Sequence, residues 1–271
     1  MSPLEQLLRD LVAIDSINPD LVPGAAGEAA IAAFIADWLR DAGLEVHIEE
    51  VRPGRPNVIG IARGTGGGRT LLLNGHLDVV GVAGMTDPFR PRVEGGRLYG
   101  RGAYDMKGGV ATCMVAAAEA AKLKLRGDVI VTAVMDEEYA GLGTLAIAER
   151  YGADGAIVAE PTELELVVAH KGFVWLEVET QGVAAHGSRP HLGVDAIVKM
   201  GGVLAGLDRL VEELSRRPAH PLLGPPSVHA STIQGGGEWS TYPDRCTLAV
   251  ERRLLPGETG DAAEAELQAI V

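Results

Sequence analysis

The amino-acid sequence predicts an α/β fold whose first domain has a mostly parallel sheet with flanking helices. Short apolar runs alternate with helical stretches up to Pro161, and this alternation is typical of βαβ crossovers. After Pro161 the expected order changes to strand, helix, strand, strand and helix. That order corresponds to an α+β split-βαβ layer that lacks its last strand.

The first domain is expected at residues 1–170. Apolar side chains recur with helical spacing in its helices, as at Ile31, Ile35 and Leu39, and Gly43 ends that helix. The expected helices are 4–14, 28–41, 107–124 and 141–151, and the expected strands are 44–51, 57–62, 70–74, 129–135 and 155–159.

The second domain is expected at residues 171–271. A further strand is expected just before it, at 164–169. Within the domain we expect strands at 172–180, 227–233 and 245–254, a long helix at 193–214 and a last helix from Gly260 onward. Because no strand follows that helix, this domain is expected to be incomplete at its C-terminal side.

Composition excludes several classes of partner. The chain has 271 residues, 46% of them apolar, which suffices for two domains with sizeable cores. A net charge of −13 leaves no basic face for nucleic acid or an anionic membrane. No apolar run reaches the ~18 residues of a membrane span, and no signal peptide is evident. With Cys113 and Cys246 in distant elements, a disulfide framework is not expected, and a cytoplasmic location fits.

Acidic and histidine side chains lie where apolar runs end. His76 and Asp78 follow the leucines at 71–73, Glu137 and Glu138 follow 129–135, Glu160 follows 155–159, and Asp105 lies in a glycine-rich loop before a helix. Each has an ordinary explanation when taken alone, as a solvated turn residue or, for Asp105, a helix N-cap. Strand ends of an open α/β sheet converge on one crevice, however, so together these residues predict a metal site.

The residue types indicate different roles within that site. A metal-bound imidazole commonly donates its other nitrogen to a carboxylate, which makes His76 a ligand and Asp78 its orienting partner. Adjacent side chains at a strand end point in opposite directions, so Glu137 and Glu138 can serve water and metal separately. An oxygen-rich set with one histidine suits a two-metal hydrolytic centre, most simply zinc, although manganese or cobalt could replace it.

Three motifs carry a resemblance to a known family. They are Gly75-His76-Leu77-Asp78, the glycine-rich stretch 100–109 that contains Asp105, and Asp136-Glu137-Glu138. With them the sequence resembles the zinc aminoacylase and metallopeptidase family that includes acetylornithine deacetylase, succinyl-diaminopimelate desuccinylase, aminoacylase and glutamate carboxypeptidase. The resemblance extends from near Leu4 to the end of the chain.

The resemblance implies a role for each residue of the site. His76 would bind one metal, Asp105 would bridge both metals, Glu160 would complete the first site, Glu138 would bind the second, Asp78 would hold His76, and Glu137 would act as general base and acid. The family's last metal ligand, a histidine in a returning C-terminal segment, has no counterpart here. The first domain is therefore also expected to be incomplete, and this chain is expected to hold at most one metal tightly and to hydrolyse little substrate by itself.

The smaller domain resembles the family's lid, through which subunits usually pair, so a homodimer is implied. The stretch 182–190 matches a lid motif whose histidine, here His186, reaches the partner subunit's active site. Arg253 matches a lid arginine that holds the substrate's free carboxylate; a solvated strand charge is the alternative for this residue. Ser240 stands where many members have an asparagine, which departs from the family pattern.

The function expected is hydrolysis of the amide bond in N-acyl amino acids by a two-zinc deacylase. A dipeptidase or carboxypeptidase acting on short peptides is the alternative within the enzyme class, because the same centre cleaves both kinds of amide. An inactive metal-binding fragment or regulatory relative is the alternative of another class, and the unmatched final ligand is what supports it.

Overall fold

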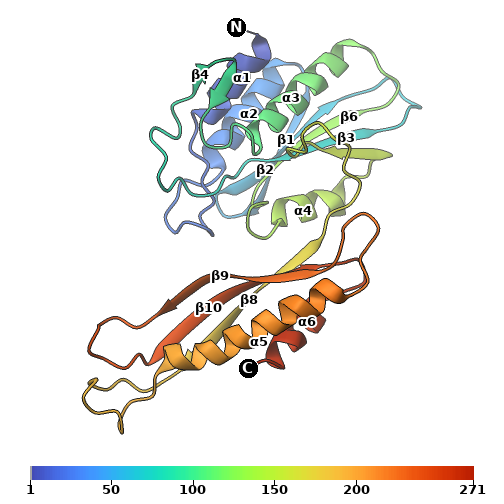
Figure 1. Ribbon diagram of the computed structural model, residues 1–271. Coiled ribbons are helices and arrows are strands. Elements are labelled where there is room, and N and C mark those ends of the chain that lie inside the picture. The colour runs from blue at the N-terminus through green and yellow to red at the C-terminus, as the bar shows by residue number, and fades with distance from the viewer. Residues whose placement is uncertain (1) are drawn as a thin grey trace. The chain divides into compact units, whose positions relative to one another are not determined.

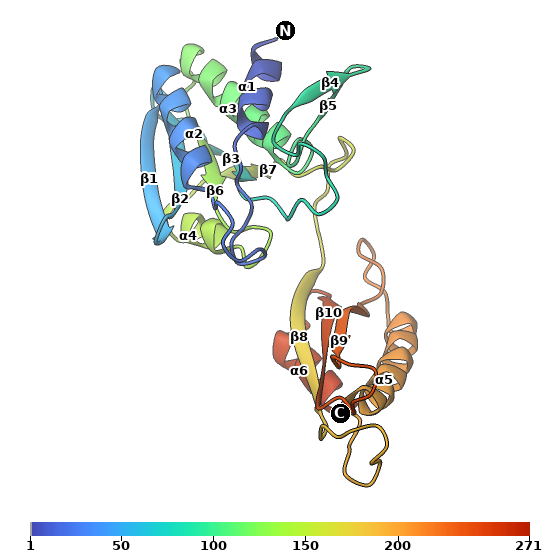
Figure 2. The same ribbon diagram turned by 90° about the vertical axis from the view of Figure 1, so that its left-hand side faces the viewer.

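The computed structural model describes residues 2–271 and divides the chain into two compact units, the first ending at Glu165 and the second comprising Leu166–Val271. Each unit has its own layer of sheet and helix, as Figures 1 and 2 show. None of the helices in the described residues is long and apolar enough to cross a membrane.

The first unit is built on a five-stranded sheet in the order β1-β2-β6-β3-β7. Its strands are β1 (Glu45–Arg52), β2 (Arg55–Ala62), β3 (Leu71–His76), β6 (Val129–Val134) and β7 (Gly155–Val158). Strand β3 pairs in parallel with β6 on one side and β7 on the other, whereas β2 is antiparallel to both β1 and β6. Four of these five strands therefore run in one direction, and the predicted α/β class with a mainly parallel sheet is confirmed.

Helices cover both faces of this sheet. They are α1 (Pro3–Val12), α2 (Ala29–Asp41), α3 (Lys107–Lys122) and α4 (Leu142–Arg150). The larger core joins α1, α2 and α3 to one face, through residues such as Leu11, Ile35 and Met114 against Val58 and Val131. A smaller core on the opposite face includes Ile147 of α4. The alternating βα pattern thus gives a sheet whose central strands β2, β3 and β6 are buried on both faces, whereas the edge strands β1 and β7 are largely exposed.

The second unit is a three-stranded antiparallel sheet with two helices. Its elements are β8 (Gly172–Gln181), α5 (Ala196–Arg216), β9 (Ser227–Gly235), β10 (Arg245–Leu254) and α6 (Gly260–Gln268), and the strand order is β8-β10-β9. The apolar stripe of α5, which includes Met200, Leu207 and Leu214, packs on Leu248 and Val250 of β10. Asp195 caps α5 by accepting a hydrogen bond from the amide of Val198.

Two local predictions differ from the structure. Residues 164–169 form no strand, and their apolar side chains, such as Leu164 and Leu166, are exposed. A hairpin of β4 (Arg92–Glu94) and β5 (Arg97–Tyr99) was not expected, because its short, exposed strands lack an alternating apolar pattern.

Candidate metal centre

The carboxyl ends of β3, β6 and β7 lie side by side because the three strands are parallel and in register. His76, the last residue of β3, pairs with Val134 of β6, and Asn74 of β3 pairs with Val158 of β7. The residues that continue β6 and β7, including Glu137, Glu138 and Glu160, therefore emerge at the same edge of the sheet as His76.

His76 is buried, and its ring is held by the residue that follows it by two positions. The Nδ1 atom lies 2.8 Å from the main-chain oxygen of Asp78 and 3.5 Å from its carboxylate Oδ1. The main-chain oxygen thus makes the shorter contact, where the sequence indicated the carboxylate. With Nδ1 donating to Asp78, the other ring nitrogen, Nε2, is directed toward the surrounding acids.

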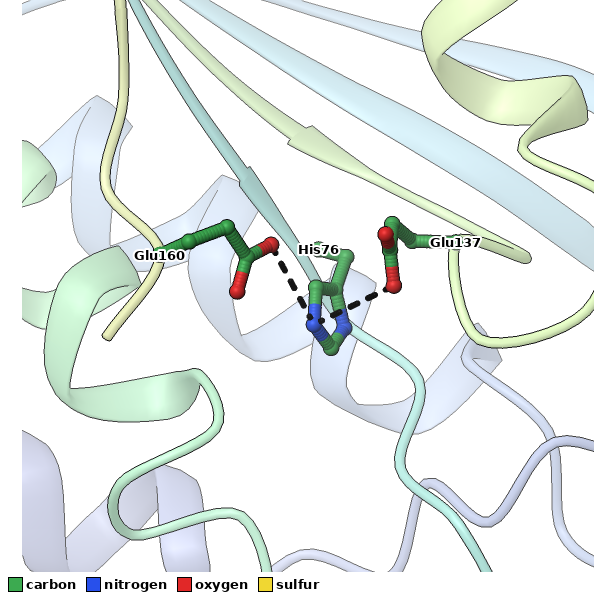
Figure 3. Close-up of side chains that lie close together, drawn as sticks. All are labelled: His76, Glu137 and Glu160. Atoms are coloured by element: carbon green, nitrogen blue, oxygen red, sulfur yellow. Dashed lines mark ion pairs between the residues drawn. The ribbon is translucent and has the colours of Figure 1, made fainter. Parts of the chain in front are cut away.

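Three carboxylates converge on that nitrogen. The Nε2 atom lies 3.1 Å from Asp105 Oδ1, 3.6 Å from Glu160 Oε1 and 3.7 Å from Glu137 Oε2. Figure 3 shows Glu137 and Glu160 pointing at the ring from opposite sides, each from a different segment. Burial disfavours the imidazolium, but hydrogen bonds with Asp105 and Asp78 outweigh it and raise the pKa of His76 to about 11.

Donor atoms of the site fall into two groups that could hold a metal ion. One group is His76, Glu137 and Glu160, and the other is His76, Asp105 and Glu138; in each, the donor atoms lie within 4.8 Å of one another. Burial, together with repulsion from nearby carboxylates, raises the pKa of Glu138 and of Glu160 to about 7 despite the attraction of His76. A divalent cation would relieve the mutual repulsion of these acids, so the donor set fits such an ion.

Asp78 is wholly buried behind His76 and organises the turn after β6. Its carboxylate accepts hydrogen bonds from the amides of Glu137 and Glu138, both at 3.0 Å, and from the Asn18 side chain at 2.7 Å. Burial opposes ionisation, but the His76 ring and these donors keep the pKa of Asp78 below its usual value. Asp78 therefore links the His76 motif to the turn that carries two glutamates.

Asp105 reaches the site from the loop before α3. Gly102 in this loop has φ +76°, a conformation that favours glycine. At Gly109 a Cβ atom would lie 2.3 Å from the main-chain oxygen of Ala159, so only glycine allows α3 to approach the segment before Glu160 so closely.

Two predicted substrate-binding residues belong to the second unit. The ring of the exposed His186 has its Nδ1 atom 2.8 Å from Ser188 Oγ. The Nε atom of Arg253 donates to Glu251 at 2.5 Å, and its guanidinium lies over the Phe173 ring, 5.2 Å from the centroid. The structure thus brings together the five predicted groups around His76, while His186 and Arg253 have these contacts within the second unit.

A layer of buried polar residues lies behind the site, and of its members only Asp136, in the motif with Glu137 and Glu138, was singled out in the sequence. Asp136 accepts a hydrogen bond from Asn18 at 3.2 Å and lies 3.3 Å from Arg55. Arg55 in turn forms two hydrogen bonds with Glu28, at 2.8 and 2.5 Å. The sequence offers two signals for this layer. Polar residues stand in the otherwise apolar stretch 55–62, and an Asn-Pro pair stands at 18–19.

Comparison with known proteins identifies the family. Residues 72–266 match Peptidase family M20/M25/M40, and this region spans most of both units. The chain belongs to this family. The matched region includes the predicted metal-site residues from His76 to Glu160 and extends through most of the second unit.

Two curated relatives and one solved structure illustrate the likeness. The chain is 33% identical over 267 residues to the N-formyl-4-amino-5-aminomethyl-2-methylpyrimidine deformylase of Bacillus subtilis (91% of this chain, 62% of the relative). It is 34% identical over 278 residues to the acetylornithine deacetylase of Myxococcus xanthus (98% of this chain, 71% of the relative). The M20 family metallo-carboxypeptidase Sso-CP2 of Sulfolobus solfataricus shares the fold, with a TM-score of 0.75 at 18% identity over 100% of this chain and 75% of that one. The chain therefore spans about three fifths to three quarters of the length of these proteins.

Proposed function

We propose that the protein is a metal-dependent hydrolase that cleaves the amide bond of N-acyl amino acids. The observation that carries this proposal is the convergence of Asp105, Glu137 and Glu160 on His76 Nε2 at 3.1–3.7 Å. The two curated relatives are named for removing an acetyl and a formyl group, which favours a small acyl group on the substrate.

The proposed ligands are those that the resemblance to the family implies. His76, Asp105 and Glu160 would hold a first ion, and Asp105 and Glu138 would contribute to a second, with zinc as the expected metal and cobalt or manganese as substitutes. The fit rests on the chemistry of the site: the Nε2 atom of one imidazole faces several carboxylates, and burial and mutual repulsion raise the pKa of two of these acids, Glu138 and Glu160, to about 7.

In the proposed mechanism the residues divide the chemistry. When bound, a divalent ion of this kind acts as a Lewis acid toward the carbonyl and toward water. Glu137 accepts a proton from water on a carboxylate oxygen and delivers it to the leaving amine. Its backbone amide donates to Asp78 Oδ1 at 3.0 Å, which holds the start of the turn after β6 beside His76.

The second unit is proposed to act as a lid that recognises substrate and pairs subunits in a homodimer. In this scheme His186 steadies the developing oxyanion in the partner subunit's site. The terminal nitrogens of Arg253 bind the substrate carboxylate while Glu251 holds its Nε atom. We also propose that the protein is cytoplasmic.

Zinc binding by the chain and hydrolysis by the whole protein test the proposal. Titration of purified chain is expected to give one tight equivalent, because the proposal leaves the second ion only Asp105 and Glu138, fewer than the three protein ligands typical of catalytic zinc. A panel of N-formyl and N-acetyl amino acids should be hydrolysed faster than dipeptides. Absence of zinc binding would contradict the metal centre, and preference for dipeptides would favour the peptidase alternative that the carboxypeptidase likeness suggests.

An inactive metal-binding relative is the remaining alternative. It predicts that the whole protein binds zinc but hydrolyses neither N-acyl amino acids nor dipeptides. The same panel, run at saturating zinc, therefore separates this alternative from both hydrolase assignments.

A further inference from the structure

Asn18 is wholly buried directly behind the proposed metal centre, in the segment between α1 and α2. Its Nδ2 group donates to Asp78 Oδ2 at 2.7 Å and to Asp136 Oδ1 at 3.2 Å. Its Oδ1 atom accepts from the amide of Asp20 at 2.9 Å, and its own amide donates to the main-chain oxygen of Val79 at 2.9 Å. These partners fix which side of the Asn18 amide is nitrogen and hold the side chain in one orientation.

The two carboxylates that Asn18 contacts both lie at the start of one turn, which follows β6. Asp78 receives the amides of Glu137 and Glu138. Asp136 is the residue before them, it is buried, and its φ of +65° is the left-handed conformation that starts the turn. Asn18 therefore contacts both the carboxylate that accepts the turn's first amides, Asp78, and the residue at which the turn starts, Asp136.

Electrostatics make an amide donor effective at this position. Asp78 and Asp136 are both wholly buried carboxylates, and two like charges close together in a medium of low dielectric repel strongly. Asn18 offers one N–H to each of them without adding a charge. The guanidinium of Arg55 lies 3.3 Å from Asp136, but among the hydrogen bonds described it makes none with Asp78. Asn18 is the side chain that donates to both acids and so joins Asp136 to Asp78.

We propose that Asn18 is a positioning residue of the metal centre: by holding Asp78 and Asp136 together, it sets the orientation of His76 and of the turn that carries Glu137 and Glu138. This inference rests on the proposed function, since it concerns the same metal site. It assigns a role in that site to a segment far from the metal motifs in the sequence, 60 residues before Asp78.

The test compares Asn18→Ala with Asn74→Ala, which removes another buried amide. The Asn74 side chain accepts a hydrogen bond from Thr132 Oγ1 at 2.7 Å and contacts neither Asp78 nor Asp136 through any hydrogen bond described. Zinc affinity is measured by competition with a chromophoric chelator, and the stability of the metal-free chain is measured by urea unfolding. Loss of a residue that orients a ligand typically weakens metal binding by about 10–100-fold.

We expect that loss for Asn18→Ala, a change of less than about threefold for Asn74→Ala, and similar losses of metal-free stability for both. Asn18→Ser retains one donor and should fall between the unaltered chain and Asn18→Ala, which keeps the test available if the alanine variant does not fold. Unchanged affinity in the Asn18 variants, or equal weakening in the Asn74 control, overturns the positioning role. Failure of the unaltered chain to bind zinc instead contradicts the metal centre itself.

Discussion

Replacing Glu137 and Glu160 separately by glutamine distinguishes a general base from a metal ligand. Their carboxylates lie almost equally far from His76 Nε2, at 3.7 and 3.6 Å, and the geometry allows either to share a metal with His76. Glutamine keeps the size of both side chains and removes the charge and the capacity to hold the proton. We expect Glu160→Gln to lose zinc and Glu137→Gln to keep it.

The expected magnitudes differ by orders of magnitude. Two unit charges about 4 Å apart interact by roughly 4 kcal/mol at an effective dielectric constant of about 20, and about 1.4 kcal/mol corresponds to a factor of ten. Loss of a ligand carboxylate should therefore weaken zinc binding by at least about 10³-fold. In the proposed mechanism Glu137 acts on water and is not a metal ligand, so we expect less than about a tenfold change there.

Zinc affinity of the two variants and turnover by the whole protein are measured side by side. If Glu137 transfers the proton, Glu137→Gln at saturating zinc should lower kcat by about 10²–10⁴-fold, or roughly 3–5 kcal/mol in the barrier. Zinc loss in Glu137→Gln as large as in Glu160→Gln would refute the division of roles. So would normal turnover by a zinc-loaded Glu137→Gln protein.

Three further results are expected from the chain. Gly109→Ala should weaken zinc binding about tenfold or more, since its Cβ would lie 2.3 Å from the Ala159 oxygen and push away the segment that carries a ligand; unchanged affinity in a calorimetric titration would contradict this. Burial of Glu258 raises its pKa, but its ion pair with Arg252 outweighs burial and lowers the pKa below 4.5. The stability that this pair gives is therefore present above pH 4.5 and is lost as the pH falls through the folded-state pKa. In urea unfolding, the free energy of unfolding of Glu258→Gln should fall less below pH 4.5 than that of the unaltered chain. Burial raises the pKa of the Cys113 thiol to about 11, so at pH 8 it should react with a disulfide reagent at least about tenfold faster in urea than in the native chain, and equal rates would contradict its burial.

The strand-end acids could be predicted because their position follows from the fold class. Parallel strands end at a common edge, so the residues after β3, β6 and β7 meet whatever their separation in the sequence. That rule predicts from the sequence alone that His76, Glu137 and Glu160 meet at one place. The individual roles of Asp105, Glu137 and Glu160 as ligand or base remain predictions, because their carboxylates all lie 3.1–3.7 Å from the same nitrogen of His76.

The polar layer behind the site could not be predicted in the same way. Asn18, Glu28 and Arg55 come from a connecting segment, the start of a helix and the start of a strand, and no spacing in the sequence relates them to Asp78. Their contacts depend on how α2 and β2 pack, which is a tertiary property. Composition alone presents them as ordinary surface polar residues, whereas Asn18 and Glu28 are wholly buried.

Local turn chemistry explains one omission, and tertiary context explains one error. The Gly95-Gly96 pair, with φ values of +57° and +77°, is a two-residue turn of the kind that joins a hairpin, so the β4–β5 hairpin had a readable signal. Residues 164–169 are mostly apolar, as in a buried strand, but they have no strand partner among the described residues and remain irregular. An apolar run needs a neighbouring strand before it becomes part of a sheet.

The pairing of β3 with β6 has a consequence for how metal and stability are linked. These strands pair residues 71–76 with residues 129–134, so the residues that carry the donor atoms around His76 are far apart in an unfolded chain. An ion held there acts as a noncovalent cross-link across that interval, and it binds the folded form in preference to the unfolded one. At a free concentration one hundred times the dissociation constant, such an ion adds about 2.7 kcal/mol to the free energy of unfolding. A supply of metal during synthesis would then help to determine how much of the chain persists in the cell, in addition to how fast it acts.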